Sequence, residues 1–195
     1  AYTLTRLQIP GSHLFELLIE LTLSLPYLLL GLSLLILFSS PPGKWLKSMG
    51  LQVVFAPAGI VMAHILVNLS YSIRMIKTAF SDSDERLEYI ARTLGASRFR
   101  SFTTVLLPLC KKGLISTFIL TWSRAMGEFG GTLMLVGVTR MKTETLPGSI
   151  YLSISTGQPQ AAMSTAMLML ILSSAAMLLA HFTEHSGQNR EREVM

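Results

Sequence analysis

Four long apolar stretches constrain this chain more than any other feature of its sequence. They cover residues 14–38, 51–73, 113–136 and 161–181, and each approaches or exceeds the ~20 residues that a helix needs to cross a bilayer. Half of all residues are apolar and only 14% are charged, whereas a soluble domain has roughly 25% charged residues. We therefore expect an all-α integral membrane protein, folded as a polytopic helical bundle.

The basic residues predict how the chain is oriented in the membrane. Eight of the 16 Lys and Arg residues lie between Arg74 and Lys112. Because cytoplasmic loops are rich in these residues, this segment is predicted to be cytoplasmic, and four alternating spans then place both termini there too. The bases form no nucleic-acid face. The single cysteine, Cys110, excludes an internal disulfide and a cysteine-rich metal site, and we expect it to be a small core residue.

A polar segment, residues 82–108, separates the second and third apolar stretches. Its pattern predicts two short helices joined at Gly95, a residue that adopts the left-handed conformation without steric cost. Asp82 or Ser83 is predicted to cap the first helix and Ser97 the second. Spacing by three and four residues gives the first helix an apolar face, formed by Leu87, Ile90, Ala91 and Leu94. Such a face on the water side of a membrane requires a partner.

The spacing of five residues in this segment resembles the EAA loop of ABC-transporter permeases. These residues are Ala91, Gly95, Val105, Leu107 and Pro108, and Pro108 is also predicted to end the second helix. The first half of the motif differs, because Tyr89 and Ile90 replace the family's Glu and Ala, although Glu88 is adjacent. An ordinary amphipathic cytoplasmic hairpin is the alternative interpretation.

The resemblance implies a mechanical role for residues 82–108. In the family, this loop inserts into a cleft of the ATP-hydrolysing subunit and transmits its movement to the membrane helices. By resemblance, the coupling residues are Glu88, Tyr89, Ile90, Ala91, Leu94, Gly95, Ala96 and Pro108.

The first span and the turn after it carry three further expectations. Glu16 and Glu20 share a helical face at the cytoplasmic entry, where they either face water or pair with Arg6. Pro26 is predicted to kink the span, and residues 41–43 to form an outer turn. The Gly-Lys pair in that turn lacks the rest of a phosphate-binding loop, so we expect ATP and Mg²⁺ to bind a partner subunit and no cofactor to bind here.

Two polar pairs lie within the predicted spans. His64 and Asn68 are one turn apart in the second span, where they form either a hydrogen-bonded pair between helices or part of a pore lining. In the third span, Arg124 lies about 17 Å from the inner surface and Glu128 is four residues further. These two charges either neutralise each other or form a fixed cation beside the path of an anion.

The residues around Arg124 carry a second resemblance. SRAMGEFGGTLMLVG is similar to the RALGEFGATLM segment of permeases for molybdate and, with more variation, for tungstate and sulfate. Gly127, Gly130 and Gly131 permit close helix packing and a break in the helix, as in a gate or a pathway wall. The tentative pathway residues are therefore Arg124, Gly127, Glu128, Gly130 and Gly131.

The last span is rich in methionine, which we interpret as packing residues rather than a metal path. It is followed by His181, Glu184 and His185, in the H-x-x-E-H spacing of some zinc proteases. No third ligand is evident, so interfacial histidines are the preferred interpretation and no metal site is predicted.

The resemblance identifies residues 1–195 as one transmembrane permease domain of an ATP-binding-cassette importer, with residues 82–108 as its coupling loop and with one or more spans expected before it. It implies a homodimer in the cell membrane that moves a tetrahedral oxyanion, with molybdate preferred over tungstate and sulfate. The implied partners are two ATPase subunits, an extracytoplasmic oxyanion-binding protein and membrane lipid. Two rival hypotheses are an ion-coupled transporter, in which Arg124 or Glu128 is the coupling group, and an intramembrane metalloprotease.

Overall fold

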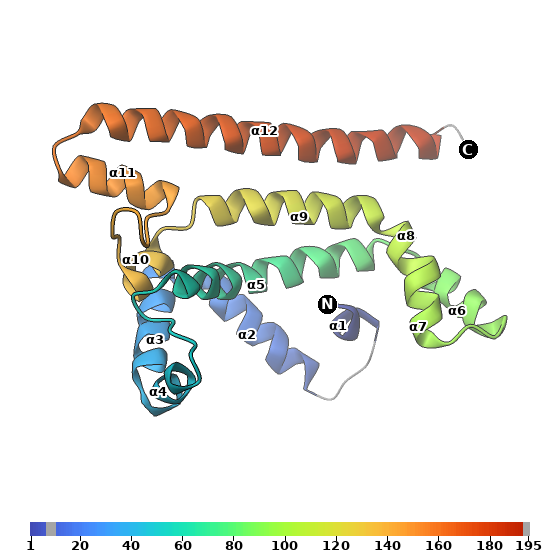
Figure 1. The fold of residues 1–195 in the computed structure, drawn as a ribbon. Helices are drawn as coiled ribbons and strands as arrows, with labels where there is room; N and C mark the ends of the chain where they lie inside the picture. Colours follow the sequence, from blue (N-terminus) through green and yellow to red (C-terminus); the bar gives the residue numbers. More distant parts are fainter. Residues whose placement is uncertain (7–10, 193–195) are drawn as a thin grey trace.

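The computed structural model describes residues 1–6 and 11–192, with side chains described as far as His181. Throughout this part of the chain the regular structure is helical, which confirms the predicted all-α membrane fold (Figure 1). The elements are α1 (Tyr2–Arg6), α2 (Ser12–Ser24), α3 (Tyr27–Ser39), α4 (Pro41–Ser48), α5 (Pro57–Ser81), α6 (Glu85–Thr93), α7 (Arg98–Ser101), the π-helical turn η1 (Phe102–Leu106), α8 (Leu107–Leu109), α9 (Lys111–Met126), α10 (Gly130–Val136), α11 (Leu146–Ser155) and α12 (Pro159–Arg192).

Three long helices lie side by side, with α9 between α5 and α12 (Figure 1). Within the described residues, α5 and the Pro159–His181 part of α12 are each long and apolar enough to cross a membrane. Two bent helix pairs raise the number of candidate spans to as many as four. The last predicted span therefore lies in α12, while the second is shifted along the chain, since α5 begins at Pro57 and ends at Ser81.

The first predicted span is not a single kinked helix. The chain bends by 112° between its two halves, α2 and α3. Leu25 and Pro26 adopt extended backbone conformations with ψ of 138° and 134°, so the helix stops at Ser24 and restarts at Tyr27. Proline has no N–H to donate and disfavours the helical conformation of the residue before it. Pro26 thus produces a corner where a kink was predicted.

The third predicted span is divided at a different place. Helix α9 ends at Met126 and α10 begins at Gly130, so the chain leaves the helical pattern among the glycines, where the sequence predicted a break. At its other end, α9 bends by 72° from the helical segment Arg98–Leu109. Pro108 does not end that segment. The π turn η1 directly precedes α8, the short helix that contains Pro108. It occupies the turn before the proline, where the proline ring would clash with a regular helical backbone.

The loops also differ from the predictions. The Pro-Pro-Gly sequence at 41–43 begins helix α4 instead of an outer turn, since proline is well suited to the first helical positions. The segment between α10 and α12 contains the further helix α11. Gly59 does not break α5. It allows close packing, since a Cβ there would lie 2.2 Å from the Val53 carbonyl oxygen and 2.4 Å from Val136 Cγ1.

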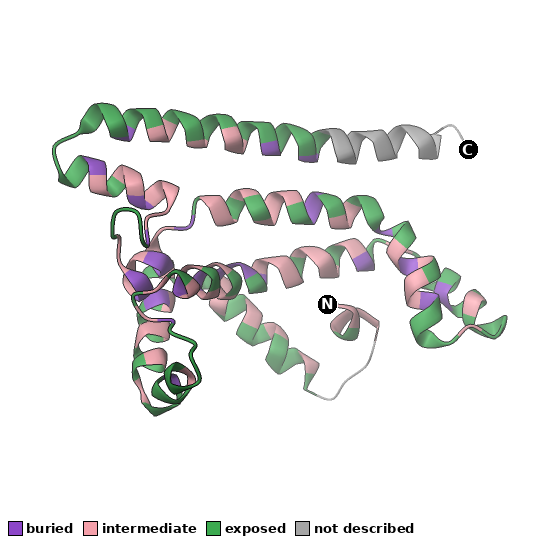
Figure 2. Cartoon of the chain, viewed as in Figure 1, coloured by how far each residue is buried: buried purple, intermediate pink, exposed green. Residues whose placement is uncertain are grey.

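Two small cores hold these helices together. One joins α5 to α10 through Val53, Ala63, Leu135 and Val136, and the other consists of Phe80, Leu106 and Cys110, which confirms Cys110 as a core residue. Elsewhere large apolar side chains are exposed, most extensively on α12 (Figure 2). Because lipid is as apolar as a protein interior, exposed side chains of this kind are suited to a bilayer and not to water.

Candidate functional site

The segment 82–108 forms a helical hairpin at the end of the molecule where α5 ends and α9 begins (Figure 1). Gly95 joins its helices with φ of +92°, as predicted from its position. Ser97 caps α7 by accepting a hydrogen bond from the Arg100 amide, which confirms the second predicted cap. The first predicted cap is wrong, because Asp84, rather than Asp82 or Ser83, accepts from the amide of the second residue of α6.

The tip of the hairpin presents apolar side chains to the surroundings. Leu94 is 83% exposed and Phe99 76%, whereas Ala91 and Ala96 are half-buried and Gly95 and Pro108 are exposed. Tyr89 and Ile90 are also exposed on the outer side of α6. The structure thus brings most of the predicted coupling residues to one end of the molecule. It also adds Phe99 to the exposed apolar surface there. Phe99 lies in the second helix of the hairpin, whereas the prediction used the periodicity of the first helix alone.

Glu88 is the exception among the predicted coupling residues. It is 7% exposed, and its Oε1 accepts a hydrogen bond of 2.8 Å from Nε of Arg6. The backbone carbonyl of Glu88 also accepts a hydrogen bond from the Ser101 hydroxyl, which links α6 to α7. Its carboxylate therefore faces the interior of this chain, where it holds the hairpin in place, while Tyr89 faces outward.

Arg6 is the hidden anchor of the hairpin. Its side chain is 8% exposed and donates five hydrogen bonds, to Glu88 Oε1, Glu85 Oε1, Ser83 Oγ and the carbonyls of Phe80 and Ser83. Arg6 therefore does not pair with Glu16 or Glu20, and this one of the two expectations for these residues is wrong. A pairing across 82 residues of sequence leaves no local signal from which it could have been found.

The neighbouring Tyr2 closes the same corner with an aromatic cluster. Its ring makes edge contacts with Phe80 and Phe102, with centroid distances of 6.3 and 4.8 Å. Its hydroxyl donates to Glu88 at 3.4 Å. Burial, and then the negative charge of Glu88, raise the pKa of Tyr2 above its ordinary value, so the hydroxyl stays a donor at physiological pH.

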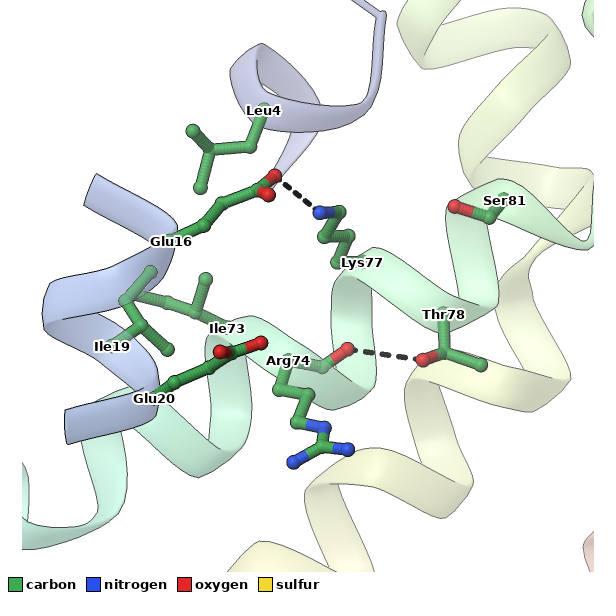
Figure 3. A pocket seen from close by; sticks show the side chains of 9 residues that line it. All are labelled: Leu4, Glu16, Ile19, Glu20, Ile73, Arg74, Lys77, Thr78 and Ser81. Carbon is green, nitrogen blue, oxygen red and sulfur yellow. Dashed lines mark hydrogen bonds and ion pairs between the residues drawn. The ribbon is translucent and has the colours of Figure 1, made fainter. Parts of the chain in front are cut away.

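A cavity of about 290 Å³ lies beside this corner, between α2 and the last turns of α5 (Figure 3). Glu16 on α2 forms an ion pair with Lys77 on α5, and Glu20 and Arg74 also line the cavity. Two acidic residues of α2 and two basic residues of α5 thus line the same cavity, and one pair of them is in direct contact. This arrangement gives Glu16 the partner that its position in the first span requires.

Arg124 and Glu128 do not pair with each other, which corrects the simpler of the two expectations. Because α9 ends between them, Glu128 turns into the protein, where it is 4% exposed and its Oε1 accepts a 2.6 Å hydrogen bond from the Gly131 amide. Arg124 instead lies close to two aromatic rings, with its guanidinium carbon 5.3 Å from the ring centroid of Tyr27 and 4.8 Å from that of Tyr71. No described carboxylate forms an ion pair with it.

The glycines of this region permit close contact between α10 and α3. A Cβ on Gly31 would lie 2.6 Å from the Gly131 carbonyl oxygen, and a Cβ on Gly130 would lie 3.2 Å from the Leu28 amide. Gly127 ends α9 and has only the Arg124 carbonyl near its Cβ position, at 3.6 Å. The predicted break and close approach are thus both present, and a role in gating remains a prediction.

His64 and Asn68 do not form the predicted hydrogen-bonded pair between helices. Asn68 donates a hydrogen bond to the His64 backbone carbonyl within α5, so no pair between helices exists among the described residues. His64 Nε2 and Asn68 Oδ1 are buried without a partner in that part of the chain. Glu184 and His185 lie outside the residues whose side chains are described. Within the described residues no group of three potential metal ligands occurs.

Fold and site together define a polytopic α-helical membrane protein with an exposed apolar hairpin at one end. Residues 5–184 match the family described as binding-protein-dependent transport system inner membrane component, and the chain belongs to this family.

Several curated relatives align over nearly the whole chain. The sulfate transport system permease protein CysW of Synechocystis sp. is 32% identical over 94% of this chain and 67% of its own length. CysT, the sulfate transport system permease protein of Escherichia coli, is 31% identical over 97% of this chain and 68% of its own length. The molybdenum transport system permease protein ModB of E. coli is also 31% identical, over 97% of this chain and 85% of its own length.

Proposed function

We propose that this chain is the membrane-spanning permease subunit of an ATP-driven importer that moves a tetrahedral oxyanion into the cytoplasm. Its family membership supports a role in binding-protein-dependent transport, and its relatives are named for sulfate and molybdenum transport. ATP hydrolysis takes place on a partner subunit, and an extracytoplasmic binding protein delivers the anion. We propose molybdate as the substrate, with tungstate and sulfate as the alternatives.

The exposed hairpin is the observation that carries this proposal. Leu94 at the hairpin tip is 83% exposed, and exposure of such an apolar side chain to water is unfavourable. The tip lies beyond the ends of the long apolar helices (Figure 1). An apolar cleft on an ATPase subunit would cover it. The polar anchor behind it, Arg6 with Glu88, supports transmission of force because it ties the hairpin to α1 and to the end of α5.

In the proposed cycle, two copies of this chain enclose a pathway. Binding of ATP brings the two ATPase subunits together. The movement passes through the hairpin to α5 and α9, whose ends it joins. The helices then tip from inward-open to outward-open, and the loaded binding protein releases its anion. The relatives include two differently named sulfate permeases, CysW and CysT. A heterodimer of two such chains is therefore the alternative to a homodimer.

Co-purification with the ATPase subunit from the same organism tests the proposal. We expect detergent-solubilised wild type to retain the ATPase and Leu94→Glu to lose at least about tenfold in binding, because burying an unpaired carboxylate in an apolar cleft is costly. Met141→Glu is the matched control, since Met141 is 94% exposed in the loop between α10 and α11. It should bind like wild type.

Transport then identifies the substrate. Proteoliposomes containing the complete importer should take up one of molybdate, tungstate or sulfate only when ATP and the loaded binding protein are present. A well-folded wild type that holds no ATPase would contradict the proposal. Uptake driven by an ion gradient without ATP would favour the ion-coupled rival.

A further inference from the structure

We propose that Arg124, Tyr27 and Tyr71 form an oxyanion-binding site inside the membrane. The inference rests on the proposed function, which supplies the oxyanion, and adds where and by which groups the permease itself holds it. Each residue comes from a different element: Tyr27 begins α3, Tyr71 lies in α5, and Arg124 is in the last turn of α9.

The three residues meet near the middle of the bilayer. At 1.5 Å per residue, Arg124 is about 20 Å from the start of α9, and Tyr71 is about 15 Å from the end of α5. Both helix ends adjoin the hairpin, so both distances are measured from the same side of a core ~30 Å thick. The guanidinium, at 5.3 and 4.8 Å from the two ring centroids, is thus held at a depth where charge is most costly.

No described carboxylate lies within ion-pair distance of Arg124, which is exposed on the surface of the single chain. The three ion pairs found among the described residues involve Arg6 and Lys77 as the cations. Glu128, the nearest acidic residue in the sequence, is buried and bonded to the Gly131 amide. Two aromatic faces attract a guanidinium, but this attraction replaces only part of the hydration that a cation loses. An anion would supply the rest.

The chemistry of the site favours an oxyanion over other ligands. The guanidinium carries five N–H donors in a planar fork and each tyrosine has a hydroxyl, and no hydrogen bond joins these groups to one another or to the other described residues. A tetrahedral oxyanion presents several acceptor oxygens, two of which fit the guanidinium fork. The two ring centroids lie 5.3 and 4.8 Å from the guanidinium carbon, and the N–H donors remain available to a ligand.

The location also provides a means of release. Because Tyr27 follows the corner at Pro26 and Arg124 precedes the break at Gly127, two of the three residues lie next to interruptions of helix. Rearrangement of either interruption would separate the rings from the guanidinium. The affinity of the site for the anion would then change with the conformation of the permease.

The test uses the complete importer in proteoliposomes, with molybdate, tungstate and sulfate as probes. We expect Arg124→Gln to lower uptake at least about tenfold, and Tyr71→Phe to lower it about two- to tenfold, as expected for charge-assisted and neutral hydrogen bonds. Arg124→Lys should recover part of the loss. ATPase co-purification should be unchanged in all three, because the hairpin is intact. Lys47→Gln, which removes an exposed cation from α4, is the control and should transport normally.

The outcomes separate this inference from the proposed function. If wild type shows no ATP-dependent uptake of any probe, the proposed function fails. If wild type transports and Arg124→Gln transports equally well, the site is wrong while the proposed function stands. If Arg124→Gln does not assemble, the near-isosteric Tyr71→Phe decides, and normal uptake by it would overturn the site.

Discussion

At the scale of single residues, two arginines show how the same side chain serves different purposes. Arg6 is saturated, with five hydrogen bonds to two carboxylates, a hydroxyl and two carbonyls at the base of the hairpin. Arg124 has two aromatic rings and no carboxylate among the described residues. A saturated buried cation is structural, while an unsaturated one within a membrane span retains the capacity to bind a ligand.

Removing Arg6 should destabilise the hairpin strongly. In Arg6→Met, the Glu88 carboxylate stays buried without its cation, and this costs about 3 kcal/mol or more. Glu85→Gln is the matched control: its side chain is 53% exposed, so loss of this ion pair should cost no more than about 1 kcal/mol. Thermal unfolding in detergent measures both.

A double substitution provides a sharper test of the Arg6 anchor. If the buried pair is the cause, Arg6→Met with Glu88→Met should be more stable than Arg6→Met alone, because no unpaired charge remains. A lower or equal melting temperature for the double variant would contradict this explanation.

Among the helices and loops, the two interruptions within predicted spans determine how α3 and α10 pack. The corner at Pro26 directs α3 against α10, and the break after Met126 lets α10 pack on α3 at glycine contacts. Backbone that leaves the helical pattern inside a membrane must be covered by protein, and here α3 and α10 cover each other. These two elements form the part of the fold beside Arg124.

The contact between α3 and α10 predicts a difference between two glycines. Gly31→Ala places a methyl group 2.6 Å from the Gly131 carbonyl oxygen, a backbone atom that cannot move aside cheaply, so we expect a loss of about 1–3 kcal/mol. Gly127→Ala has 3.6 Å to its nearest neighbour and a φ of −85°, so it should unfold near the wild-type temperature. Equal melting temperatures for the two variants would rule out close packing at Gly31.

At the scale of the whole molecule, the hairpin and the loop between α10 and α11 lie at opposite ends of α9 (Figure 1). The positive-inside rule predicts that the hairpin is cytoplasmic, because half of the basic residues flank or lie within it. The α10–α11 loop should then be extracytoplasmic. Under the proposed function, we expect the substrate and the binding protein to approach from that side, and the ATPase from the other.

Labelling with a membrane-impermeant thiol reagent tests this orientation. Met141→Cys should react in spheroplasts, whereas Leu94→Cys should react only in inverted vesicles or after permeabilisation, since both side chains are more than 80% exposed. Cys110 is 5% exposed and gives a low background, and wild type is the control for it. Reaction of Leu94→Cys in intact spheroplasts would reverse the orientation and remove the basis for ATPase docking.

Features that depend on neighbouring residues could be predicted from the sequence. Apolar length predicted the membrane class, Gly95 and Ser97 predicted the geometry of the hairpin, and the spacing of Leu94 and Ile90 predicted an exposed apolar face. Each rests on interactions within a few positions of the chain, which a sequence displays directly. Helix boundaries beside prolines were less predictable, because the same residue can kink, end or begin a helix.

The partners of the charged groups could not be predicted from the sequence and are known from the folded chain. Arg6 pairs with Glu88 across 82 residues of sequence, and Glu16 pairs with Lys77 across 61. Arg124 contacts two tyrosines of other elements instead of Glu128. Such partners depend on how the chain turns at Pro26 and at residues 127–129. Each buried charge must be paired or solvated, but which groups lie within reach is set by packing of distant segments, and no local pattern records it.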